Sequence, residues 1–237
     1  MVFAFGTILA IIALTWLPTS PPAVSVAIHS IVIGDSQRSY RLVTPHDLPG
    51  PIPVVFAFHG VGDSPESMAA YSQLDQMAAE RGFLLVYPTG INAMWSTFEF
   101  DVAQLDSNRD VRFFDEMLAR IARQFDIDRE RIYLTGMSNG GSFVQLLANA
   151  RSEEVAAVVA CSGSRPKGLE DAGRRFPILL IVGEKDLAAS SMRNDVRGYQ
   201  SAGHDAELIV VAALGHEWSS QHNHAALEFL LDRRLQK

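Results

Sequence analysis

The chain has 237 residues, and 48% of them are hydrophobic, so it can bury one sizeable core and has no room for a second folded domain. The formal net charge is −7, and the 20 Lys and Arg residues form no basic run, which argues against nucleic acid as a partner. The single cysteine, Cys161, excludes an intramolecular disulfide and lies in an apolar run, so we expect a buried, unreactive thiol.

The first 27 residues differ from the rest of the chain. Residues 3–17 are almost continuously apolar and a Pro-rich stretch follows, but a membrane span needs roughly twenty such residues. The run therefore favours an export signal, with the small residues 25–27 as its cleavage site. No Lys or Arg precedes it, so an uncleaved anchor or a cytoplasmic protein stays open. We expect a secreted or periplasmic protein, a folded domain at 28–237, and no stable membrane partner unless the segment is retained.

From residue 28 onward, β-rich runs come first and strands then alternate with helices. We expect strands at 29–33, 39–43, 54–59, 83–87, 131–135, 155–161, 178–182 and 207–211. Helices are expected at 65–81, 110–125, 140–150, 191–202 and 220–233. Most of these strands are continuously apolar, which is typical of a sheet buried on both faces. The order predicts an α/β fold with a mostly parallel sheet, helices on both faces and no large lid.

The central motif is Gly-Met-Ser-Asn-Gly-Gly at 136–141, between a predicted strand and a predicted helix. A sharp turn there lifts the Ser138 hydroxyl above the sheet edge, and the strained backbone needs small neighbours such as Gly136 and Gly140. An ordinary glycine-rich turn is the alternative. A Walker-type phosphate loop is disfavoured because no Lys precedes the serine. We therefore interpret Ser138 as a nucleophile.

A base for Ser138 should follow the last strand, at the same edge of the sheet. His216 has that position, whereas His204 precedes the strand and His222 and His224 fall in the final helix. A metal site built from His216, His222 and His224 is disfavoured, because residues two apart on a helix do not face one another. We therefore predict His216 as the base and expect no metal.

The third member of the predicted triad is a carboxylate that orients the imidazole. Asp186 follows the penultimate strand and would accept the Nδ1–H of His216. Glu184 is the nearest alternative, and Asp195 is a more distant one.

Two backbone amides should bind the oxyanion that forms when Ser138 attacks a carbonyl. One is the amide of Asn139, directly after the nucleophile, and the other comes from the loop 59–62, whose glycines allow close approach. We predict Val61 as the second donor. His59 precedes Ser138 in the chain, and we interpret it as a structural ring that stabilises this loop.

With these positions assigned, the chain resembles the bacterial poly(3-hydroxybutyrate) depolymerase-like and feruloyl/acetyl-xylan esterase family of α/β-hydrolases. The resemblance extends over nearly the whole chain from about residue 30. The residues that carry it are 59–62, Tyr87, Pro88, Trp95, 110–113, 127–133, 136–141, Asp186 and 215–218. It implies an α/β-hydrolase fold, ester cleavage through an acyl-enzyme, no cofactor, and export.

The chain departs from this family at two points. Met94 precedes Trp95 where much of the family has a disulfide-forming cysteine, and Trp218 leads into Ser219 where Pro-Gly often follows. These departures bear on polymer degradation more than on ester hydrolysis.

Three large side chains are expected to line a substrate pocket: Trp95, Met137 and Trp218. For the two tryptophans, the alternative is a place in the core. The sequence thus predicts a serine carboxylic-ester hydrolase acting on polymer-derived feruloyl, acetyl or hydroxyalkanoate esters. A serine peptidase of the same fold, or a non-catalytic binding protein that keeps the fold, is the alternative.

Overall fold

The computed structural model describes residues 23–98 and 100–235. The apolar run at 3–17, expected to be an export signal, therefore lies outside the described residues. Within the part of the chain that is described, no helix has both the length and the apolar character needed to cross a membrane.

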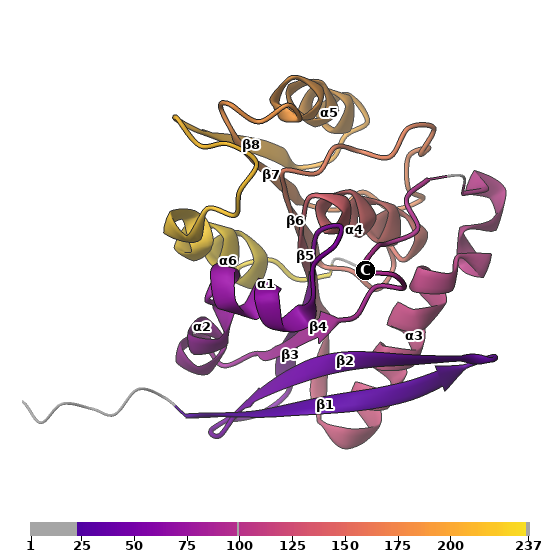
Figure 1. The fold of residues 1–237 in the computed structure, drawn as a ribbon, viewed down its shortest axis with the longest axis vertical. Helices are drawn as coiled ribbons and strands as arrows, with labels where there is room; N and C mark the ends of the chain where they lie inside the picture. The colour runs from indigo at the N-terminus through magenta and orange to yellow at the C-terminus, as the bar shows by residue number, and fades with distance from the viewer. Residues whose placement is uncertain (1–22, 99, 236–237) are drawn as a thin grey trace, which may run out of the picture.

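An eight-stranded sheet with the order β1-β2-β4-β3-β5-β6-β7-β8 forms the centre of the fold (Figure 1). Its strands are β1 (Val24–Ile33), β2 (Ser36–Pro45), β3 (Ile52–Phe58), β4 (Leu84–Pro88), β5 (Ile127–Met137), β6 (Ala157–Cys161), β7 (Ile178–Gly183) and β8 (Ala206–Val211). The pairs β1/β2 and β2/β4 are antiparallel, and all other neighbouring strands are parallel. The predicted mostly parallel sheet is confirmed.

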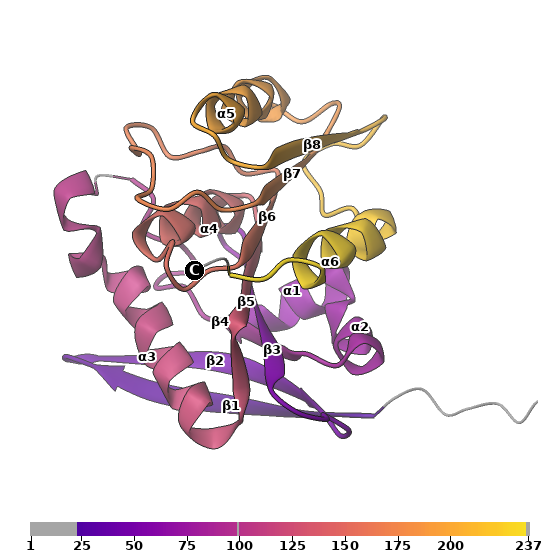
Figure 2. The same ribbon diagram turned by 180° about the vertical axis from the view of Figure 1, so that it is seen from behind.

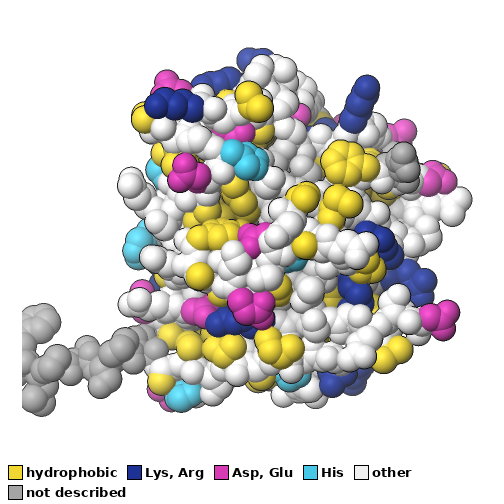
Figure 3. All heavy atoms as spheres, in the orientation of Figure 1, with side chains coloured by type: hydrophobic (Ala, Val, Ile, Leu, Met, Phe, Trp, Pro, Cys, Tyr) yellow, Lys and Arg dark blue, Asp and Glu magenta, His cyan; other side chains and the backbone are white. Residues whose placement is uncertain are grey.

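Helices cover both faces of the sheet, as Figures 1 and 2 show from opposite sides. On the face seen in Figure 1, hydrophobic side chains are scattered among charged and polar ones (Figure 3). They are α1 (Pro65–Ser72), α2 (Leu74–Arg81), α3 (Arg109–Gln124), α4 (Asn139–Ala150), α5 (Ala189–Ser201) and α6 (Asn223–Leu231), with short 3-10 helices at Val102–Ser107 and Ser220–His222. Side chains of α3, α4 and α5 share one apolar core, and those of α1, α2 and α6 share the other.

The side chains of β3 show why its sequence is continuously apolar. Val54, Phe56 and Phe58 point into the core under α3 and α4, whereas Val55 and Ala57 point into the core under α1 and α2. Successive side chains of a strand face opposite sides of the sheet, so a strand covered on both sides must be apolar at every position.

The helix expected at 65–81 is two helices. Gln73 has φ 57° and ψ 25°, in the left-handed region, and its N–H donates to the Ala69 carbonyl, which ends α1. α2 begins at the next residue in a new direction. The expectation of one continuous helix is wrong because a left-handed residue cannot continue a right-handed helix.

The first strand begins earlier than expected, at Val24 instead of residue 29. Its pairing with β2 is continuous from Val24 opposite Pro45 to Ile33 opposite Ser36. Residues 25–27, where a cleavage site was expected, therefore lie inside β1. This strand is at one edge of the sheet and exposes the apolar side chains of Val26, Ile28 and Val32.

The parallel part of the sheet brings four loops to one edge. β3, β5, β7 and β8 run in the same direction, so their carboxyl ends lie together. The loops that follow these strands contain Gly60, Ser138, Asp186 and His216.

Candidate active site

Ser138 occupies the tight turn between β5 and α4. Its φ of 56° and ψ of −118° are strained for a residue with a Cβ. The Ser138 N–H donates to the Cys161 carbonyl at 2.8 Å, and its own carbonyl accepts from the Ser142 N–H at 2.9 Å. A Cβ at Gly136 would lie 2.6 Å from the Gly140 carbonyl carbon, and one at Gly140 would overlap the Phe58 carbonyl oxygen. The two flanking glycines are thus required by close backbone contact.

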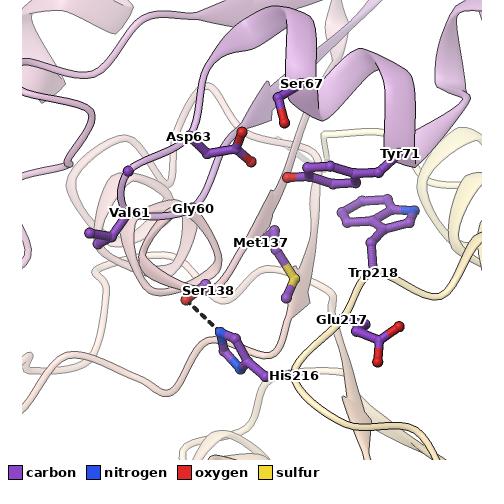
Figure 4. Close-up of a pocket in the computed structure, with 11 residues that line it drawn as sticks. Gly60, Val61, Asp63, Ser67, Tyr71, Met137, Ser138, His216, Glu217 and Trp218 are labelled. Atoms are coloured by element: carbon purple, nitrogen blue, oxygen red, sulfur yellow. Dashed lines mark hydrogen bonds between the residues drawn. The ribbon is translucent and has the colours of Figure 1, made fainter.

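The Ser138 hydroxyl lies at one end of a chain of hydrogen bonds. Its Oγ is 2.8 Å from Nε2 of His216 (Figure 4). Nδ1 of the same ring is 2.9 Å from Oδ2 of Asp186. An ionised carboxylate can only accept, so it holds the proton on Nδ1 and leaves Nε2 to accept from the serine. The Asp186 side chain is 1% exposed and that of His216 is 51% exposed, so the imidazole is open to solvent and to a substrate.

Asp186 is buried but is stabilised as an anion. Burial by itself would raise the pKa of this carboxyl group, but hydrogen bonds from the Ala188 amide, at 2.8 Å, and from His216 outweigh it, and the pKa is lowered. Of the three carboxylates considered from the sequence, Asp186 is the one that contacts His216. Glu184 accepts from the Ala213 N–H instead, and Asp195 accepts from the Arg165 N–H.

The other histidines of the C-terminal region lie away from Ser138. His204 is buried at the opposite end of β8, where its Nδ1 contacts the backbone of Phe176. His222 is bonded to the Ser219 hydroxyl. Within residues 23–98 and 100–235, no three His, Cys, Asp or Glu side chains form a group that could hold a metal ion.

The two amides expected to bind an oxyanion come from segments that lie against Ser138. Asn139 is the first residue of α4, so its N–H has no acceptor within the helix. In the loop after β3, a Cβ at Gly60 would lie 3.4 Å from the Cβ of Ser138, and Val61 follows with its side chain exposed. Neither the Val61 nor the Asn139 amide donates a hydrogen bond among the described residues.

The role expected for His59 as a structural ring is confirmed by its contacts. The ring is fully buried, its Nδ1 lies 2.7 Å from the Gly60 carbonyl, and its Nε2 accepts from the Gly90 N–H at 3.0 Å. Burial lowers the pKa of His59, so the ring is neutral and can donate with one nitrogen and accept with the other.

A cavity of about 490 Å³ opens beside Ser138 (Figure 4). Its walls come from the loop after β3, from α1, from the end of β5 and from the loop after β8. The lining residues are Gly60, Val61, Gly62, Asp63, Ser67, Tyr71, Met137, Ser138, His216, Glu217 and Trp218. Met137 and Trp218 line it as expected from the sequence.

Four lining residues were missed from the sequence: Asp63, Ser67, Tyr71 and Glu217. Ser67 and Tyr71 are four residues apart on α1, so they share one helix face. α1 starts just after the loop at 59–62, which was expected at the site. The start of this helix was therefore the sequence signal that could have identified Ser67 and Tyr71.

Trp95 does not line this cavity, which corrects the expectation from the sequence. Its side chain is 1% exposed, and its ring packs 5.0 Å from Phe58 and 5.4 Å from Phe143, between ring centroids. The indole Nε1 donates to the His59 carbonyl at 2.8 Å. The Asn139 side chain bonds to the backbone of Trp95 and holds this loop under the turn at Ser138, so the ring faces the core.

The family model described as "Esterase PHB depolymerase" matches residues 39–172. A bifunctional acetylxylan esterase/xylanase of Neocallimastix patriciarum is 27% identical over 163 residues, which cover 69% of this chain and 22% of that protein. Feruloyl esterase D of Neurospora crassa is 27% identical over 157 residues, which cover 61% of this chain and 51% of that protein. The chain therefore spans about half or less of the length of these two relatives.

Solved structures show the same fold at low sequence identity. A mutant of the feruloyl esterase module from Clostridium thermocellum, complexed with sinapinate, has a TM-score of 0.73 and 14% identity, with 89% of each chain covered. An S-formylglutathione hydrolase of Staphylococcus aureus has a TM-score of 0.73 and 10% identity, covering 88% of this chain and 99% of that one. The α/β-hydrolase fold expected from the sequence is confirmed.

Proposed function

The chain belongs to the PHB depolymerase family of esterases, whose model matches more than half of its residues, and from that premise we propose that it hydrolyses carboxylic esters with Ser138, His216 and Asp186 as its catalytic triad. The observation that carries the proposal is the continuous set of hydrogen bonds from the Ser138 hydroxyl through His216 to a buried carboxylate. A hydroxyl held in this way at the wall of a cavity is suited to attack a carbonyl carbon.

The reaction proceeds through an acyl-enzyme. Ser138 Oγ attacks the ester carbonyl while Nε2 of His216 takes the hydroxyl proton, and the amides of Val61 and Asn139 stabilise the oxyanion. His216 then donates that proton to the leaving alkoxide. In the second half of the reaction, His216 activates a water molecule, which hydrolyses the acyl group from Ser138. Asp186 holds the imidazole in the required tautomer and stabilises its charged form.

Esters of polymer-derived acids are the proposed substrates: feruloyl, acetyl or hydroxyalkanoate esters. The names of the acetylxylan and feruloyl esterase relatives support this class. Trp218 and Met137 supply an apolar wall beside Ser138, which suits an aromatic or aliphatic acyl group. Action outside the cytoplasm, in the periplasm or the medium, is part of the proposal and is supported by the apolar run at 3–17.

Turnover of 4-nitrophenyl acetate by the wild type and by Ser138→Ala tests the proposal. We expect the variant to lose about four to six orders of magnitude in kcat while its circular dichroism spectrum stays unchanged. Wild-type turnover in the variant would refute the role of Ser138. Turnover of a matched peptide amide alongside its ester would indicate a peptidase. A wild type that does not react with a fluorophosphonate probe would indicate a non-catalytic protein.

A further inference from the structure

The cavity beside Ser138 contains two carboxylates and no Lys or Arg side chain. Asp63 comes from the loop after β3, and Glu217 directly follows His216. The two side chains lie on either side of Met137 in the view of Figure 4. None of the residues that line the cavity is Lys or Arg, and no ion pair to Asp63 or Glu217 occurs within residues 23–98 and 100–235.

The side chains of Tyr71 and Trp218, which also line the cavity, do not compensate this negative charge. Burial, followed by the Asp63 carboxylate, raises the pKa of the Tyr71 hydroxyl, so this group is neutral. The Nε1–H of Trp218 donates to the Asn223 side chain at 2.9 Å and is already used. An anionic group that enters the cavity beside the ester therefore loses water and meets two like charges, with no Lys or Arg side chain in the lining to offset them.

We propose that Asp63 and Glu217 select substrates by charge, so that the enzyme hydrolyses neutral and cationic esters and discriminates against esters with an anionic group in this cavity. This inference rests on the proposed function, because it concerns the substrate of the same site. It predicts that polymer fragments with a free carboxylate next to the scissile ester are poor substrates. The neutral interior units of the same polymer, or neutral aryl esters, are good ones.

The test uses two substrate series that carry the charge on opposite sides of the ester. One series is phenyl acetate with a 4-carboxylate, a 4-carboxamide or a 4-trimethylammonium group, and the other is methyl benzoate with the same three groups. For each series, kcat/KM of the charged ester is divided by that of the neutral carboxamide on the same enzyme. Effects of a substitution on the chemical step, including any effect of Glu217 on His216, cancel in this ratio.

The variants are Asp63→Asn, Glu217→Gln and the double variant, with Asp35→Asn as the matched control. Asp35 is exposed in the turn between β1 and β2, so its substitution makes the same change in net charge far from the cavity. In at least one series we expect the anionic-to-neutral ratio to rise about fivefold for each carboxylate removed, at low salt. The wild-type ratio should also rise with added salt, which screens exposed charges, and Asp35→Asn should leave it unchanged.

The outcomes separate the two proposals. Neutral esters that are hydrolysed, with ratios in both series unaffected by the double variant, would overturn the charge selection and leave the esterase function intact. A wild type that prefers the anionic esters would also overturn it. If no neutral ester is hydrolysed and the fluorophosphonate probe does not react, the esterase proposal fails, and the charge selection fails with it.

Discussion

The side chain of Asn139 is hydrogen-bonded to both backbone polar groups of Trp95. Its Oδ1 accepts from the Trp95 N–H at 2.7 Å, and its Nδ2 lies 3.3 Å from the Trp95 carbonyl and 2.7 Å from Oγ1 of Thr97. Asn139 also directly follows Ser138. One buried side-chain amide thus links two segments: the turn that carries the Ser138 hydroxyl and the loop that contains Trp95 and Thr97.

Replacing this amide by an apolar group of similar size should weaken both the fold and the site. In Asn139→Leu, the Trp95 N–H is left buried without an acceptor, so we expect the free energy of unfolding to fall by about 2–4 kcal/mol. We also expect kcat to fall at least tenfold, because the amide proposed to bind the oxyanion belongs to the same residue. Urea unfolding and ester turnover measure the two effects.

Asn149→Leu, at the partly exposed end of α4, is the control, and it should lower the free energy of unfolding by no more than about 1 kcal/mol. Equal losses in the two variants would contradict the role given to Asn139.

A comparison of kcat between two carboxylate variants should identify the residue that orients His216. Asp186→Asn keeps the shape of the side chain but removes the acceptor that holds the proton on Nδ1 of His216, so we expect kcat to fall by about four orders of magnitude. Glu184→Gln, two residues earlier, should change kcat less than about threefold, because Glu184 contacts the Ala213 backbone instead. A larger loss in the Glu184 variant would reverse this assignment.

The strained backbone of Ser138 should make its substitution by glycine stabilising relative to alanine. Both variants lack the hydroxyl, but only glycine adopts φ 56° and ψ −118° without steric cost. We expect Ser138→Gly to be more stable than Ser138→Ala by about 1 kcal/mol in chemical unfolding. The same pair at Ser142, inside α4, is the control and should have the opposite order, since glycine costs about 1 kcal/mol relative to alanine in a helix. Equal stability of the two Ser138 variants would show that the turn stores no strain.

Stability should decrease on mild acidification. Burial lowers the pKa of both His59 and His204 in the folded protein, whereas in the unfolded chain each titrates near about 6.5. Below that pH the unfolded state binds more protons than the folded state, so the stabilisation present above about pH 6.5 is lost as the pH falls. Urea unfolding at several pH values between 7.5 and 5 should show this decline, and it should be shallower in His204→Gln. An unchanged slope in that variant would exclude His204 as a source.

The arrangement of Ser138, His216 and Asp186 could be predicted from the sequence because it depends on chain order and strand direction. Ser138, Asp186 and His216 each follow a strand, and in a parallel sheet the ends of such strands share one edge. The glycines around Ser138 signalled the turn because backbone contacts there exclude a Cβ. The roles of these residues in catalysis stay predictions that the variants above test.

The cavity could not be predicted in the same way, because its walls depend on how loops are tied down. The burial of Trp95 follows from the hydrogen bonds made by the Asn139 side chain, which no local pattern reveals. The break at Gln73 likewise depends on one left-handed residue that is not glycine. The early start of β1 at Val24 is decided by pairing with β2, a partner beyond the range of local periodicity.

The single thiol of the chain lies beside the turn at Ser138. Cys161 is 4% exposed, burial raises its pKa to about 12, and its carbonyl accepts the hydrogen bond from the Ser138 N–H. A thiol reagent can therefore reach it only when the packing around Cys161 opens. The rate at which a thiol reagent modifies Cys161 under native conditions therefore measures how often the packing beneath the Ser138 hydroxyl opens. The natural cysteine reports this local opening without an engineered label.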